Sequence, residues 1–278
     1  MTRCIFASIF ALITLCSNSQ TVTLPQASST QTLKQNFGLG SIELSYSRPS
    51  LKNRVAFKEL SELAPIDKIW RTGANGATTL TFNNDVLINN VAVKAGKYGL
   101  LSIPGKKSFT LIISKDIDVS QPTAYKVEND LLRYTATISK LNEKVETFTI
   151  QFANITYSTC DLQISWGNTL VTLPIVANVK DKIKADIEKS LDSDKPALGS
   201  IATYYYEIEK DYTKALEYAT KAISSKPSYG LFLLKAKIEK EIGDKASAKV
   251  SAEKCIDLAK TANNDDVVRS AKELINKL

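Results

Sequence analysis

The spacing of hydrophobic residues changes once along the chain. In the first part apolar and polar positions alternate, as at Phe148 and Ile150, and a period of two is typical of a half-buried strand. Near Asn178 the period lengthens, and Ile183 and Ile187 lie four residues apart, as on one face of a helix. The pattern therefore predicts a β domain followed by an α-helical domain.

The first domain consists of short alternating stretches separated by turn residues. We expect strands at 41–48, 77–82, 86–88, 91–103 with a break at 95–96, 108–114, 123–127, 131–139, 145–153, 161–166 and 169–176. The last two would form a hairpin about Gly167-Asn168. This spacing predicts an antiparallel β-sandwich, or a barrel-like sandwich, over residues 37–177. Residues 20–36 are expected to be an extended lead-in, and residues 55–64 one or two helical turns.

The second domain, residues 178–278, contains an internal repeat. The residues Asp211, Ala215, Ala219 and Ala222 recur 33 positions later (211 to 244) as Asp244, Ala248, Ala252 and Cys255. Small residues at such positions allow two helices to approach closely. The repeat therefore predicts α-helical hairpins.

Residues 1–19 have the composition of a signal peptide: a positive start at Arg3, an apolar run over 4–16 and then small polar residues. Cleavage after Ser19 would give an exported protein, periplasmic or extracellular. A lipoprotein anchored through Cys16 is the alternative, which the large Leu15 before it disfavours. No later apolar run has membrane length, so we expect no transmembrane segment in the mature chain.

Composition limits the chemistry. The net charge is +7, but acidic residues are interleaved with basic ones, which favours a solvated surface over a nucleic-acid partner. The chain contains no histidine, which removes Ser-His and Cys-His nucleophiles and most zinc sites. We find no catalytic constellation and expect no cofactor or metal. Cys160 and Cys255 are expected to be buried free thiols, although an exported protein permits a disulfide.

A polar and aromatic set stands out near the first predicted strands. It comprises Arg48, Arg54, Trp70, Arg71 and Asn75, with Tyr98 farther along. One interpretation is an anion- or glycan-binding pocket, with guanidinium groups as donors and an aromatic ring as a stacking platform. The other is structural, with the arginines holding a long loop to the sheet. Exposure of Trp70 would separate the two interpretations.

The same region carries a family resemblance. The motifs are Tyr46-Ser47-Arg48-Pro49-Ser50, Ile69-Trp70-Arg71-Thr72-Gly73-Ala74-Asn75, Ala95-Gly96-Lys97-Tyr98-Gly99-Leu100, Ile103-Pro104-Gly105 and Glu146-Thr147-Phe148-Thr149-Ile150. The chain resembles DUF2911, a family of unknown function found in exported proteins of Gram-negative bacteria, over roughly residues 22–176. Val55-Ala56-Phe57-Lys58 departs from the family's apolar-Phe-Gly turn, and the loop at 120–122 lacks its Trp-Gly. The resemblance implies an exported protein and a fold, but it implies no activity.

The helical domain resembles tetratricopeptide repeats. Tyr206, Ala215, Ala222 and Pro227 have the spacing of that motif, but Gly199 stands where tryptophan is often found. The resemblance implies a concave face that binds a protein or peptide. Our leading hypothesis is a non-enzymatic envelope protein that binds its partner through these helices. Fewer than three units also permit a purely structural role. The alternative function is a carbohydrate-binding, anion-binding or carbohydrate-active β domain that uses the Arg48, Trp70, Arg71 and Asn75 region.

Overall fold

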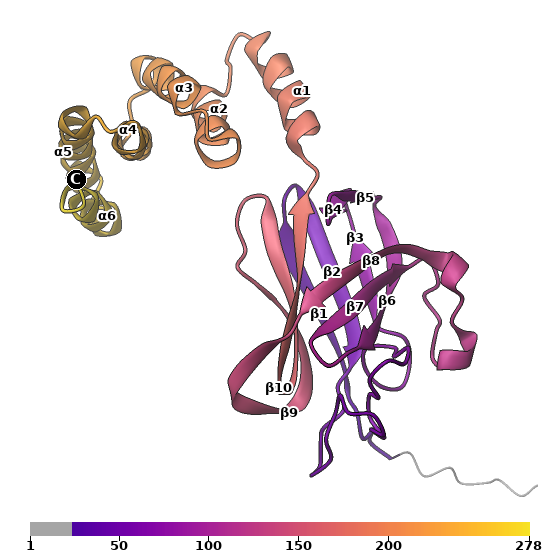
Figure 1. Ribbon diagram of the computed structural model, residues 1–278. Helices are drawn as coiled ribbons and strands as arrows, with labels where there is room; N and C mark the ends of the chain where they lie inside the picture. The colour runs from indigo at the N-terminus through magenta and orange to yellow at the C-terminus, as the bar shows by residue number, and fades with distance from the viewer. Residues whose placement is uncertain (1–23) are drawn as a thin grey trace, which may run out of the picture.

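The computed structural model describes residues 24–278, in which antiparallel β-sheets precede six α-helices (Figure 1). This confirms the predicted order of a β domain and a helical domain. Residues 1–23, which contain the expected signal peptide and Cys16, lie outside the described residues. Within residues 24–278, no helix combines the length and the apolar character needed to cross a membrane.

Two sheets form the β domain. The first has the strand order β1-β2-β3-β6-β7-β8 and the second the order β5-β4-β10-β9. The strands are β1 Thr30–Phe37, β2 Gly40–Ser47, β3 Thr79–Phe82, β4 Val86–Ile88, β5 Val91–Val93, β6 Gly96–Pro104, β7 Ser108–Ser114, β8 Asp130–Thr137, β9 Ser139–Ala153 and β10 Thr159–Ala177. Inward-facing apolar residues of both sheets form one core, which includes Leu44 and Leu80 from the first sheet and Ile150 and Leu173 from the second.

Strand β1 corrects the expectation of an extended lead-in up to residue 36. It pairs with β2 along its full length, from Thr30 opposite Ser47 to Phe37 opposite Gly40. Its sequence TQTLKQNF has few apolar residues. Main-chain hydrogen bonds to β2, its one neighbour, hold this edge strand in the sheet. A prediction based on hydrophobic alternation therefore missed it.

Strand β10 corrects the expected hairpin about Gly167-Asn168. It runs unbroken from Thr159 to Ala177 and pairs with β9, with irregular register on either side of Gly167. Gly167 has φ 60°, a conformation that serves a bulge as well as a two-residue turn. The sequence signal for the two structures is thus the same.

Two further expectations were wrong. Residues 55–64 form no helix, because the Ser61 hydroxyl donates to Val55 O and accepts from Ala64 N, which stabilises an irregular turn instead. Residues 123–127 form no strand; the 3-10 turns Pro122–Ala124 and Val127–Asn129 occupy this loop.

The helices are α1 Lys180–Leu191, α2 Leu198–Tyr204, α3 Tyr212–Ser225, α4 Tyr229–Ile242, α5 Lys245–Thr261 and α6 Asp265–Ile275. A π-helical turn, Tyr205–Glu209, continues α2. Asp211 caps α3 by accepting from Lys214 N, and Asp244 caps α5 by accepting from Ser247 N, both at 3.0 Å. The small residues of the predicted repeat are all buried at helix contacts. The predicted hairpins are therefore present, and the 33-residue repeat extends to their caps.

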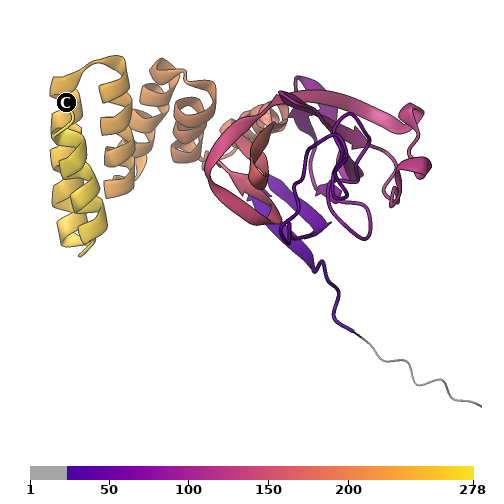
Figure 2. The same cartoon turned by 60° about the horizontal axis from the view of Figure 1, so that its bottom comes forward.

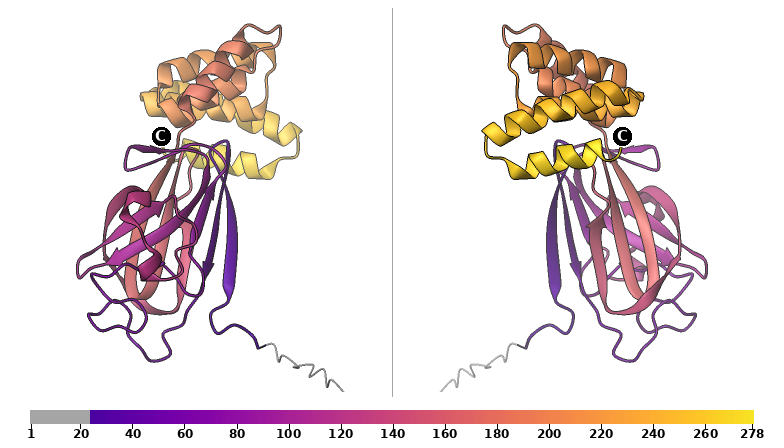
Figure 3. Two further views of the ribbon diagram at one scale, coloured as in Figure 1. Left: turned by 90° about the vertical axis from the view of Figure 1, so that its right-hand side faces the viewer. Right: turned by 90° about the vertical axis from the view of Figure 1, so that its left-hand side faces the viewer.

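The helices form a layer beyond one end of the β domain (Figure 2). Helices α2, α4 and α6 lie on the side of this layer that is turned toward the β domain, and α3 and α5 lie on the outer side (Figure 1, Figure 3). Val179, buried in the β core, joins β10 to α1. Ile183 of α1 then packs against both the β core and the helical cluster around Ile187 and Tyr204.

Candidate functional site

Trp70 lies in the core of the β domain, with 6% of its surface exposed. Its ring stacks on Trp166 at 5.9 Å and 9°, and meets the edge of Phe148 at 5.1 Å. Its main chain pairs with Ser102, since Trp70 N donates to Ser102 O at 2.8 Å and Ser102 N donates to Trp70 O at 2.9 Å. A ring packed in this way offers no stacking surface to a glycan.

Arg48 connects the two sheets. Its Nε donates to Phe148 O at 3.2 Å, and its Nη2 donates to Thr149 Oγ1 at 2.9 Å. Arg48 therefore fastens the end of β2 to β9 at the point where Pro49 ends the hydrogen-bonding ladder.

Arg54 and Tyr98 each bind main chain close to their own position. Arg54 donates to Leu51 O at 3.0 Å and to Ser50 O at 3.1 Å, which closes its own loop. The hydroxyl of Tyr98 donates to Lys94 O at 3.0 Å, and its ring packs near Phe82. The two residues thus have separate, local partners.

Arg71 and Asn75 fasten loops to the β domain. Arg71 Nη1 donates to Ser120 O, while its buried Nε has no hydrogen-bond partner within residues 24–278. Asn75, at φ 57°, donates to Ser28 O at 2.8 Å and so holds the segment before β1. The six candidate residues therefore contact different neighbours and do not converge on one pocket. The burial of Trp70 favours the structural interpretation.

A buried polar cluster supports the same loop and was not anticipated. Thr72 Oγ1 donates to Ser102 Oγ at 2.9 Å, and Thr78 Oγ1 donates to Thr72 O at 2.7 Å. All three side chains are buried, and Thr72 adopts the left-handed conformation at φ 55°. Threonine and serine are too common for their types alone to mark such a cluster in a sequence.

The helical domain presents two cavities on its inner face, which we define as the surface of α2, the π turn, α4 and α6. One cavity, of about 460 Å³, lies between α2 and α4 and is also lined by Tyr157 of the β9–β10 turn. The other, of about 320 Å³, is lined by Tyr206 of the π turn together with residues of α4 and α6 and with Lys277, which follows α6. Lys237 lines both cavities, so they adjoin along α4.

Charged side chains on the inner face are free to meet a ligand. Lys237, Lys240, Lys277, Glu241 and Glu273 line the smaller cavity, and none of the ion pairs within residues 24–278 includes them. Burial and the nearby carboxylates raise the pKa of Tyr206 to about 12, so its hydroxyl stays protonated and can donate. The face therefore offers hydrogen-bond donors and separated charges along a row of helices.

No group of His, Cys, Asp and Glu side chains within the described part of the chain is arranged to hold a metal ion. Cys160 and Cys255 are both buried and unpaired, as expected for thiols that pack as small apolar groups.

Comparison with known proteins places the β domain. The family model described as "Protein of unknown function (DUF2911)" matches residues 28–175, more than half of the 278 residues. The chain belongs to the DUF2911 family. No curated protein matches the chain, and no solved structure matches it.

The DUF2911 match spans the strands from β1 to most of β10 and all six candidate residues of the β domain. The Arg48 and Trp70 contacts thus belong to the framework of the DUF2911 domain. The inner face lies outside the matched residues, whereas Tyr157, which lines one of its cavities, lies within them.

Proposed function

We propose that the protein binds an extended peptide segment of another protein along its inner face, and that the DUF2911 domain is the scaffold that carries this face. The observation behind the proposal is the pair of adjoining cavities between α2, α4 and α6, the smaller of which is lined by charged side chains that lie outside the ion pairs within residues 24–278. A ligand can engage such charges without first breaking an ion pair of the protein. The burial of the Trp70 ring argues against glycan binding at this residue.

The helical layer is of tetratricopeptide type in this proposal. Two features support it: the helix caps Asp211 and Asp244 repeat with the same geometry, and the first helix of each hairpin lines the inner side. Stacked helical hairpins generate concave binding surfaces of this kind. Because Lys237, Lys240 and Lys277 outnumber Glu241 and Glu273 at the smaller cavity, we expect the bound segment to carry carboxylates.

We also propose that the protein is exported and that its partner belongs to the cell envelope. The support is the sequence of residues 1–19, with its positive start and short apolar run. Fractionation of cells that produce the chain with and without residues 2–19 tests this. Equal amounts of both forms in the cytoplasm would contradict export.

Site-specific photo-crosslinking tests the binding face. A photoreactive amino acid replaces Lys237 in one variant and Lys249 in another; Lys249 is exposed on α5, on the outer side of the layer. We expect a discrete adduct in producing cells from position 237 and none from position 249. Mass spectrometry of the adduct identifies the bound segment.

Charge reversal then tests the recognition. With the photoreactive group at position 237, the double change Lys240→Glu and Lys277→Glu is expected to abolish the adduct, whereas Lys249→Glu is expected to leave its yield unchanged. An adduct of equal yield from both photoreactive positions, or one that survives the double reversal, contradicts peptide binding at the inner face.

A further inference from the structure

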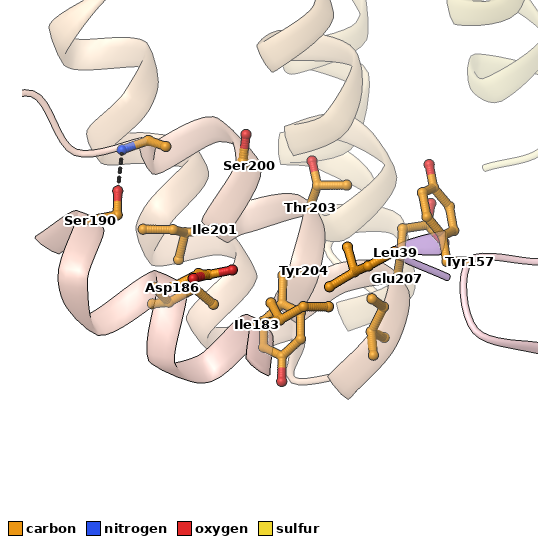
Figure 4. Close-up of a pocket in the computed structure, with 13 residues that line it drawn as sticks. Leu39, Tyr157, Ile183, Asp186, Ser190, Ser200, Ile201, Thr203, Tyr204 and Glu207 are labelled. Atoms are coloured by element: carbon orange, nitrogen blue, oxygen red, sulfur yellow. Dashed lines mark hydrogen bonds between the residues drawn. The ribbon is translucent and has the colours of Figure 1, made fainter. Parts of the chain in front are cut away.

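A separate cavity lies where the β domain meets the first helices. It has a volume of about 350 Å³, toward the lower end of the range of about 300–1,000 Å³ found for small-molecule pockets. Ile183 and Ile187 come from α1, Ile201 and Tyr204 from α2, and Leu39 and Tyr157 from turns of the β domain (Figure 4). Two helices, the π turn and two strand turns thus line a single, largely apolar space.

Both charged residues described at this cavity are acidic. Of the 13 described residues that line it, Asp186 and Glu207 are carboxylates, and none is lysine or arginine. Within residues 24–278, Asp186 makes no ion pair and no side-chain hydrogen bond. Glu207 forms one ion pair there, with Lys210 at 3.8 Å. The carboxylates stand on different walls, since Asp186 belongs to α1 and Glu207 to the π turn.

Apolar surface remains uncovered beside these carboxylates. Leu39 is 48% exposed and Tyr157 is 58% exposed. Removing apolar area from water stabilises a complex by about 25 cal/mol per Å². A carboxylate facing the same space favours a positive group on the ligand and disfavours a negative one. The lining therefore selects an apolar body that carries a cation.

We propose that this cavity binds a small amphiphilic cation, with its apolar body between α1 and α2 and its ammonium group facing Asp186 and Glu207. Peptide binding at the inner face is a separate property, and either can hold without the other. The two sites adjoin at Tyr157, Ser200, Thr203 and Glu207, which line both cavities. A cation bound in this cavity would therefore lie beside a peptide bound on the inner face.

Three probes with one tail and different head groups test the proposal: n-octylammonium, n-octanol and n-octanoate. Each is titrated into the chain from Gln20 to Leu278, and the isoleucine methyl groups are followed by NMR. We expect saturable shifts at Ile183, Ile187, Ile201 and Ile208, and none at Ile113 or Ile175 of the β core. Octylammonium is expected to bind about fivefold more tightly than octanol, the factor for a partly exposed ion pair, with octanoate the weakest.

Two sets of variants separate head from tail. The double change Asp186→Asn and Glu207→Gln is expected to remove the preference for octylammonium but to leave octanol binding unchanged. Asp181→Asn with Glu188→Gln removes two exposed carboxylates of α1 that do not line the cavity, and should leave the preference intact. Ser200→Trp, at an exposed lining position, should abolish the shifts with all three probes.

Three results would overturn the proposal: no saturable shift with octylammonium, octanoate binding as tightly as octylammonium, or a cation preference that survives the Asp186→Asn and Glu207→Gln change. The double amide variant conserves side-chain size, so it decides the matter even if Ser200→Trp fails to fold.

Discussion

Trp70 draws its environment from four separate parts of the chain. Its ring contacts Phe57 from the preceding loop, Phe148 from β9 and Trp166 from β10, and its main chain pairs with Ser102 of β6. Aromatic pairs in such edge and stacked arrangements add stabilisation beyond the area they bury. The residue that was most prominent in the sequence as a ligand platform is thus the centre of an aromatic cluster.

We predict that Trp70→Ala lowers the free energy of unfolding of the β domain by about 3–5 kcal/mol, the usual cost of removing a large buried aromatic ring. The matched control is Arg54→Ala, which removes an exposed side chain bound only to its own loop, and is expected to cost under about 1 kcal/mol. Urea denaturation followed by tryptophan fluorescence measures both, because the chain's two tryptophans, Trp70 and Trp166, both lie in the β core. Equal losses in the two variants would contradict the assignment of Trp70 to the core.

The buried thiol of Cys160 is expected to lower the stability of the β domain at alkaline pH. Burial, with a smaller contribution from Asp161, raises the pKa of this thiol from 9.0 to about 12. The folded protein therefore keeps the proton in a range where the unfolded chain releases it. The contribution is fully present below pH 9 and is lost as pH rises toward 12.

We predict that the free energy of unfolding falls as pH rises above 9, and falls less steeply in Cys160→Ala. The comparison of slopes matters, because the buried Tyr46 hydroxyl, whose pKa burial also raises, adds loss in the same direction above about pH 10. Denaturation between pH 8 and pH 11 measures the slopes. Parallel curves for the two proteins would show that Cys160 does not titrate in this way.

At the scale of elements, hydrophobic alternation predicted the strands whose two faces differ in polarity. Phe148 and Ile150 of β9 are fully buried, whereas their neighbour Gln151 is exposed. Alternation failed for β1, which lies at a sheet edge, and turn chemistry failed at Gly167, where a bulge needs the same backbone as a hairpin. Both failures concern which segment pairs with which, and such pairing depends on distant parts of the chain.

The 33-residue repeat extends to the helix caps Asp211 and Asp244, which the structure identifies and the sequence analysis did not. We expect Asp211→Ala and Asp244→Ala each to destabilise the helical domain by about 1 kcal/mol, since each removes a bond to an otherwise unpaired main-chain N–H. The control is Asp257→Ala within α5, which removes no cap. Thermal unfolding followed by circular dichroism compares them; losses no larger than that of the control would contradict the capping role.

At the scale of the molecule, the sequence predicted two domains and a binding face on the helices, but not the lining of either helical site. Tyr157 belongs to a strand turn of the β domain, yet it lines cavities with α2 and α4. Lys237, Lys240 and Lys277 line the same cavity only because α4 packs beside α6. Packing between distant segments brings such groups together, and the local spacing of residues in the sequence does not predict that packing.

The proposed separation of a β scaffold from a helical binding face requires that the β core be stable without the helices. That core closes with Val179, while α1 adds only the partly buried Ile183 to it. The remaining helices pack mainly on one another around small clusters, such as the one formed by Ala202, Ala215, Ala219 and Ile238. Removal of the helices therefore exposes little of the β core.

The most direct test compares the chain from Gln20 to Leu278 with a chain that ends at Val179, by thermal unfolding and by capture of the partner identified through position 237. We predict that the shorter chain remains folded, with a midpoint close to that of the β domain in the full protein, and captures no partner. A shorter chain that unfolds, or one that still captures the partner, would contradict a DUF2911 scaffold carrying a helical binding face.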